Sequence, residues 1–146
     1  MKKFSAILIA CLFSLITYGQ HDSILKVSMV RKLTGEIKDF TTDNLGNIYL
    51  LNFVNQIKKV NERGDSIAVY NDVRRYGKIY SIDATNPLKV LVFYKDFSAI
   101  VVLDRLLNAR TAIDLRKQNI LQVSTVTSSY DNNIWVFDEL DSKIKK

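Results

Sequence analysis

Short apolar stretches alternate with polar turns along most of the chain, and they recur at a nearly constant interval. Three segments start with an apolar residue, pass through turn-forming residues and end with a β-branched and a large apolar residue: residues 40–49, 82–91 and 126–135. Their starts lie 42 and 44 residues apart. Another β-rich stretch follows each segment, beginning at Ile57, Ile100 and Ile144. The pattern predicts short antiparallel strands in repeated units.

Each complete unit has room for four strands. Polar turns at residues 61–65 and 104–108 are followed by further predicted strands at residues 66–70 and 110–115. No stretch of ten residues after Gln20 has helical periodicity. A unit of about 40–45 residues with four strands is typical of a β-propeller blade. We therefore predict an all-β fold with propeller-type repeats, as an incomplete ring of about two and a half blades. The boundaries are residues 39–80, 81–124 and 125–146, the last unit being partial.

The first unit resembles a known repeat. The run Asp43-Asn-Leu-Gly-Asn-Ile-Tyr49, followed by Asn55-Gln-Ile57 and Gly64, is similar to an NHL-type blade. The similarity extends from Asp39 to Lys146, but the second unit has Asn-Pro-Leu-Lys at residues 86–89 in place of the glycine turn. Exported six-bladed propellers of bacteria carry such blades. The resemblance implies this fold and export, and it assigns no functional residue.

Two and a half blades are fewer than the four to eight that close a propeller. Three explanations are open at this point: a longer chain, copies that assemble to complete a ring, or another small β architecture. Residues 20–38 form an N-terminal segment with a strand-like run at residues 23–33. In many propellers a strand ahead of the first unit completes the last blade. The other strands of that blade would then lie in further sequence, which favours the longer chain.

The first nineteen residues have a different character. Lys2 and Lys3 precede an apolar run over residues 4–16, and Gly19 supplies a small residue before Gln20. This layout predicts a secretory signal peptide at residues 1–19. The run is shorter than the roughly 20 residues that span a bilayer, so no transmembrane span is expected. The protein is expected to be periplasmic, outer-membrane-associated or secreted.

Cysteine and histidine are nearly absent. Cys11 is the only cysteine, and as a lipobox-like position it offers a lipid anchor as a minor alternative to cleavage at Gly19. His21 is the only histidine. A His/Cys metal cluster and a Ser-His-Asp triad are therefore not expected. We predict no catalytic residue, no metal site and no cofactor.

The charge is modest. The formal net charge of +6 falls to +4 without Lys2 and Lys3, which is too weak and dispersed to predict a nucleic-acid partner. Four carboxylates lie near predicted turns, where Asp bonds its own backbone: Asp43, Asp83, Asp131 and Asp138. We interpret them as turn residues, and Trp135 as a core residue because its repeat counterparts are Tyr49 and Leu91.

One predicted rim gathers basic and aromatic residues. It combines the connections between units with the turns between second and third strands, which also include Phe53. Arginine and tyrosine there can hold carboxylates or stack on sugars, although solvated loop charge is the simpler interpretation. The candidate ligand-binding residues are Arg74, Arg75, Tyr76, Lys78, Tyr94, Phe97, Arg116 and Lys117.

Two classes of function fit these patterns. The first is an exported binding or scaffold module for a protein, peptide or glycan. The second is a propeller enzyme of the lactonase or quinoprotein type, whose site residues would come from further blades. A structural surface protein is a third class that the sequence leaves open.

Overall fold

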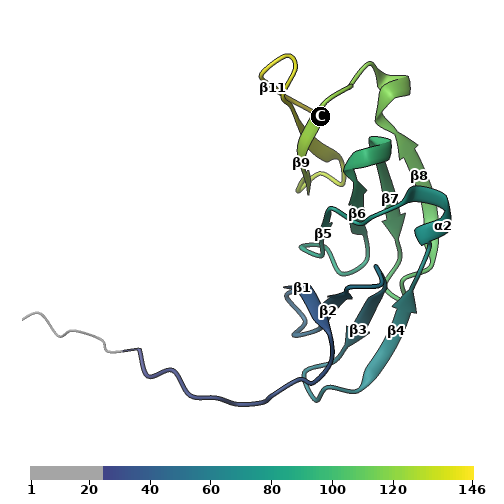
Figure 1. Cartoon of the computed structure of the whole chain (residues 1–146). Helices are drawn as coiled ribbons and strands as arrows, with labels where there is room; N and C mark the ends of the chain where they lie inside the picture. Colours follow the sequence, from purple (N-terminus) through teal and green to yellow (C-terminus); the bar gives the residue numbers. More distant parts are fainter. Residues whose placement is uncertain (1–24) are drawn as a thin grey trace, which may run out of the picture. The chain divides into compact units, whose positions relative to one another are not determined.

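The computed structural model describes residues 25–146 (Figure 1). The predicted leader, with Cys11, and His21 lie outside the described residues. Residues 25–32 belong to a unit of their own and contain no helix or strand. The strand predicted over residues 23–33 is therefore not formed in its described part, where no strand among residues 25–146 pairs with it.

Residues 33–146 contain eleven strands in three antiparallel sheets, each ordered as in the chain. The first sheet contains β1 (Ile37–Thr42), β2 (Ile48–Asn52), β3 (Ile57–Val60) and β4 (Ser66–Tyr70). The second contains β5 (Ser81–Asp83), β6 (Val90–Tyr94), β7 (Ala99–Leu103) and β8 (Ala109–Asp114). The third contains β9 (Val123–Ser128), β10 (Ile134–Asp138) and β11 (Lys143–Lys145). The all-β class and the incomplete ring of propeller-like sheets are confirmed.

The helical segments are single turns within the connections. They are α2 (Val73–Tyr76), which joins the first two sheets, η1 (Lys95–Phe97) and η2 (Leu115–Gln118). Each is too short to show helical periodicity in the sequence. Two of them, α2 and η2, direct the chain from one sheet to the next, whereas η1 lies in the turn between β6 and β7. All three carry predicted rim residues.

The core lies between successive sheets, and β6 has both faces in it. All five residues of β6 are buried. Because neighbouring side chains of a strand point to opposite faces, Val90, Val92 and Tyr94 pack in the cluster toward the first sheet. Leu91 and Phe93 pack in the cluster toward the third sheet. The unbroken apolar sequence of this strand therefore corresponds to burial on both of its faces.

The repeat is preserved in the strand register. Tyr49 pairs with Lys59 in the first sheet, and Leu91 pairs with Val102 at the corresponding place in the second. The turns that follow the second strand of each sheet share a left-handed residue: Asn55, Ser98 and Ser142. The three sheets are thus copies of one structural unit, down to single turn positions.

Trp135 differs from its prediction. Its side chain is 37% exposed, whereas its counterparts Tyr49 and Leu91 are buried. Each counterpart faces the sheet that follows its own. Within the described residues no sheet follows the third, so Trp135 lies on an open face instead of in the core.

Candidate functional site

The connections between sheets lie at one end of the strands. Since each sheet is an antiparallel meander, alternate connections lie at opposite ends. The sheet-to-sheet connections therefore share an end with the turns between second and third strands. We call this end the connecting rim, defined as residues 53–56, 71–80, 95–98, 115–122 and 139–142.

Four of the eight predicted rim residues line one hollow of about 250 Å³. They are Arg75, Tyr76, Phe97 and Arg116. Arg75 and Tyr76 come from α2, Phe97 from η1 and Arg116 from η2. Three connections that are distant in sequence thus contribute to the same small site, which we call the rim pocket.

The rim pocket combines positive charge with aromatic surface. The Arg75 guanidinium lies 5.1 Å from the centre of the Tyr76 ring, and the Tyr76 ring lies 5.2 Å from that of Tyr94. Arg116 Nε lies 3.2 Å from Asp114 Oδ1, so an acidic neighbour partly offsets its charge. Among the described residues no carboxylate lies within ion-pair distance of Arg75. Arg75 is therefore the stronger candidate for holding an anion.

The other four predicted rim residues do not line this pocket. Arg74, Lys78 and Lys117 are exposed on the connections around it. Tyr94 is a core residue, and its assignment to the rim is wrong: its side chain is 0% exposed. Its hydroxyl donates to the Tyr70 hydroxyl at 3.1 Å, and burial raises its pKa. Tyr94 supports the pocket from beneath, through the ring of Tyr76.

Asn55 holds the connection that carries α2. Its side-chain oxygen accepts from the Ile79 amide at 2.7 Å, and its amide nitrogen donates to the Gly77 carbonyl at 2.8 Å. Asn55 is itself buried. The sequence analysis missed this role. The available signal was an asparagine at the left-handed position that recurs as Ser98 and Ser142.

Replacing Gly77 by alanine tests how tightly this connection is packed. Gly77 has a φ of +74°, and an added Cβ would lie 3.1 Å from a ring carbon of Phe97. The left-handed backbone alone costs an alanine about 1–2 kcal/mol. We expect Gly77→Ala to lower the free energy of unfolding, measured by urea titration, by more than that amount.

Gly46→Ala is the matched control. Gly46 has a φ of +79°, but its added Cβ would come no closer than 3.7 Å to another residue. It should therefore show the backbone cost alone. In a Phe97→Ala background, Gly77→Ala should lower the free energy of unfolding by no more than Gly46→Ala does. Equal losses for Gly77→Ala and Gly46→Ala in the wild-type background would contradict the close packing of Gly77 against Phe97.

A second group of ionisable side chains is buried in the first sheet. The Asp43 carboxylate accepts from the Tyr49 hydroxyl at 3.0 Å and from the Asn47 amide at 2.9 Å. Lys59 Nζ lies 3.9 Å from Asp43 Oδ2 and 5.0 Å from the centre of the Tyr49 ring. Burial opposes ionisation of Asp43, but these hydrogen bonds outweigh it and lower the pKa. Burial lowers the pKa of Lys59. The group joins a turn to its sheet and leaves no acidic or basic atom free for a ligand.

The other three carboxylates near turns bond their own backbone. Asp83 accepts from the amide of Thr85, Asp131 from that of Asn133 and Asp138 from that of Leu140. Their interpretation as turn residues is confirmed. Asp83 does more, because it also accepts from the Thr127 hydroxyl at 2.8 Å and so links the second and third sheets.

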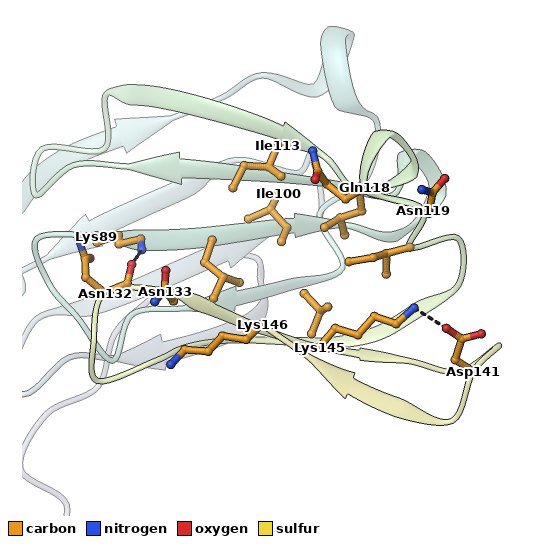
Figure 2. Close-up of a pocket in the computed structure, with 14 residues that line it drawn as sticks. Lys89, Ile100, Ile113, Gln118, Asn119, Asn132, Asn133, Asp141, Lys145 and Lys146 are labelled. Atoms are coloured by element: carbon orange, nitrogen blue, oxygen red, sulfur yellow. Dashed lines mark hydrogen bonds and ion pairs between the residues drawn. The ribbon is translucent and has the colours of Figure 1, made fainter.

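A larger hollow, a trough of about 720 Å³, lies between the second and third sheets (Figure 2). Ile100 and Ile113 line it from the second sheet, and Val136 lines it from the third. Lys145 lies at its margin, and its Nζ is 2.7 Å from Asp138 Oδ2. The floor of the trough is apolar and the charges at its side are paired. The trough therefore resembles an uncovered part of the core more than a polar binding site.

Across residues 25–146, no group of three or more histidine, cysteine, aspartate or glutamate side chains is placed to hold a metal ion. None of the helices in the same range is long and apolar enough to cross a membrane.

Comparison with known proteins identifies structural relatives only. No protein family and no curated protein matches the sequence. Among solved structures, the chain is similar to catalytically inactive virginiamycin B lyase from Staphylococcus aureus with quinupristin, at 16% identity and a TM-score of 0.54. It is also similar to the selenomethionine-substituted form of that enzyme, at 15% identity and a TM-score of 0.55.

The similarity covers 72% of this chain but only 35% of the lyase. The chain thus spans about a third of the enzyme that it resembles. At this level of identity the likeness supports the β-propeller-like fold alone.

Proposed function

We propose that this protein is an exported propeller-like module that binds an acidic peptide segment through its connecting rim. The observation that carries the proposal is the rim pocket, where Arg75 and Arg116 stand beside the rings of Tyr76 and Phe97. A hollow of about 250 Å³ is of a size to accept one side chain or a chain terminus. A guanidinium group can hold a carboxylate through two parallel hydrogen bonds.

The surroundings of the pocket support an anionic ligand. Arg74, Lys78 and Lys117 are exposed around it. Clustered positive charges raise the local concentration of anions and speed their association. This attraction is screened by salt, so binding should weaken as ionic strength rises. The two aromatic rings add apolar contact beside the charge.

Arg75→Ala should weaken binding of a fluorescein-labelled oligoglutamate peptide about tenfold or more. A hydrogen bond to a charged group contributes about 1.5–3 kcal/mol, and each 1.4 kcal/mol corresponds to a factor of ten. Arg116→Ala should have a smaller effect, because its side chain is 56% exposed and already paired with Asp114. Fluorescence anisotropy at low salt measures both.

Arg63→Ala is the control for net charge. Arg63 is exposed in the turn between β3 and β4, at the opposite end of the strands. It should leave the affinity nearly unchanged. If Arg63→Ala weakens binding as much as Arg75→Ala does, general charge attraction is responsible and the pocket is not the site.

Export and the NHL-type resemblance are part of the same proposal. The basic start, the apolar run and Gly19 support cleavage and periplasmic, outer-membrane or extracellular location. Fractionating expressing cells and measuring the intact mass tests this. Loss of residues 1–19 supports export, an acylated Cys11 indicates a lipoprotein, and an intact cytoplasmic chain contradicts both.

A second candidate is part of a propeller enzyme. The likeness to virginiamycin B lyase favours it. Incubating the protein with quinupristin and following the compound by liquid chromatography tests the idea directly. A new product that forms only in the presence of the protein would support an enzymatic role. Unchanged quinupristin would exclude this compound as a substrate.

A further inference from the structure

The outer side of the third sheet repeats a surface that is buried in the other two sheets. Phe137 pairs with Ile144 on this side, beside Trp135, and all three are exposed. The corresponding pairs are Leu51 with Ile57 and Phe93 with Ile100, and these four residues are buried by the sheet that follows. We call the exposed surface the trailing face; it contains Trp135, Phe137 and Ile144. In the first and second sheets, the equivalent surface is covered by the next sheet.

The first sheet has the complementary open surface. The register aligns Phe40, Leu50, Lys58 and Val69 across its four strands. We call this row the leading face. Its counterparts in the second sheet are Ile82, Val92, Val101 and Ala112. Val92 and Val101 are buried against the first sheet, whereas Phe40 and Val69 are exposed. The leading and trailing faces are thus the two halves of an interface that the chain already builds twice.

Within residues 25–146 the third sheet has three strands, whereas each of the other two has four. Within the described residues β11 pairs with β10 alone, so its outer edge is open. The trough lies beside this edge, with Ile113 and Val136 in its floor (Figure 2). An open edge next to an apolar floor is suited to the addition of an extended strand.

The segment before β1 has the position of a fourth strand in the repeat. Ten residues join β4 to β5 and eight join β8 to β9. Six residues join Val30 to β1, which starts at Ile37. In an extended chain Leu25, Val27 and Met29 share one face, and all three are exposed. Residues 25–30 therefore precede the first sheet in the sequence as a fourth strand precedes each later sheet, and their apolar side chains are exposed.

We propose that two copies of this chain pair head to tail and close a ring of six sheets. The leading face of each copy packs on the trailing face of the other, and residues 25–30 add a fourth strand to the partner's β11. Leu25, Val27 and Met29 then cover the trough. Six sheets fall within the four to eight of closed propellers, whereas three copies would exceed it. The ring has two equal interfaces, as two-fold symmetry requires.

The connection is long enough for this pairing. Crossing three strand spacings and one sheet-to-sheet distance takes about 17 Å. The seven steps from Val30 to Ile37 span up to roughly 23 Å when extended. No rearrangement of the first sheet is therefore needed for its preceding segment to reach the partner.

The test uses the protein as isolated from expressing cells. Light scattering should show twice the mass of one chain, becoming monomeric on dilution. Trp135 is the only tryptophan, so its fluorescence should shift to shorter wavelength as the dimer forms. Phe137→Glu and Val69→Glu should each give monomers, and Met29→Glu should weaken the dimer. Phe53→Glu, at an exposed rim position, should leave it unchanged.

Mixing the two monomeric variants identifies the head-to-tail arrangement. Phe137→Glu keeps a sound leading face and Val69→Glu keeps a sound trailing face, so the mixture should form one-to-one dimers through a single interface. Three results overturn the proposal: a wild-type monomer at all concentrations with unchanged Trp135 emission, variants that fail to restore dimers on mixing, and an isolated protein whose mass shows further chain covering the trailing face.

Discussion

Replacing Phe93 by alanine is expected to lower the free energy of unfolding by about 3–5 kcal/mol. Phe93 is 1% exposed and lies on β6, in the cluster between the second and third sheets. Its truncation removes apolar contact and leaves a cavity between two sheets that cannot close up independently. Urea unfolding followed by far-ultraviolet circular dichroism at one protein concentration measures the change.

Phe53→Ala provides the matched comparison. Phe53 is 69% exposed in the turn after β2. The same chemical change there should cost less than about 0.5 kcal/mol, as is usual for surface positions. Similar losses at the two positions would mean that the sheet-to-sheet cluster does not carry the stability of the fold.

Replacing Asp43 by alanine is expected to cost about 3–5 kcal/mol as well, because it leaves a buried lysine without its partner. The side chains of Asp43 and Lys59 are 0% and 4% exposed. The Tyr49 hydroxyl would also lose its acceptor. Lys59→Met in the same background should recover part of the loss, since it removes the uncompensated charge and keeps most of the volume.

The pH dependence gives this prediction a second measure. The pKa of Asp43 is lowered in the folded protein. Its contribution is therefore present above the unfolded pKa of about 3.9 and is lost as pH falls through the lowered value. The stabilities of the wild-type protein and Asp43→Ala should therefore begin to converge as pH falls below about 3.9, and the loss should be complete only below the lowered pKa of Asp43. Asp104→Ala is the control: Asp104 accepts hydrogen bonds from the amides of its own turn in the same way, but its charge acts on Lys59 more weakly than that of Asp43 does.

The strands were predictable because each is encoded locally. The predicted strands at residues 57–60 and 66–70 coincide with β3 and β4. Two-sided burial of β6 followed from its unbroken apolar sequence. The turn carboxylates were predictable for the same reason, since Asp43 and Asp83 bond amides within a few residues of themselves.

The rim pocket was only half predictable because its residues depend on distant partners. Arg75 and Phe97 could be placed at one end of the sheets by counting strands. Tyr94 could not be separated from them, because its burial depends on Tyr70 and Tyr76 from other elements. The bond from Asn55 to Ile79 spans 24 residues, and no local pattern encodes it.

The two-sided burial of β6 has a consequence for how such a chain can change in length. The middle sheet meets its predecessor and its successor through the same repeat positions. A gene duplication that inserted one more unit of 42–44 residues would therefore bring both of its contact surfaces with it. An insertion of one residue within a strand would instead move the side chains that follow it to the opposite face. Evolution by whole units is thus the route of least disruption for this architecture, and blade number is the property most open to variation among its descendants.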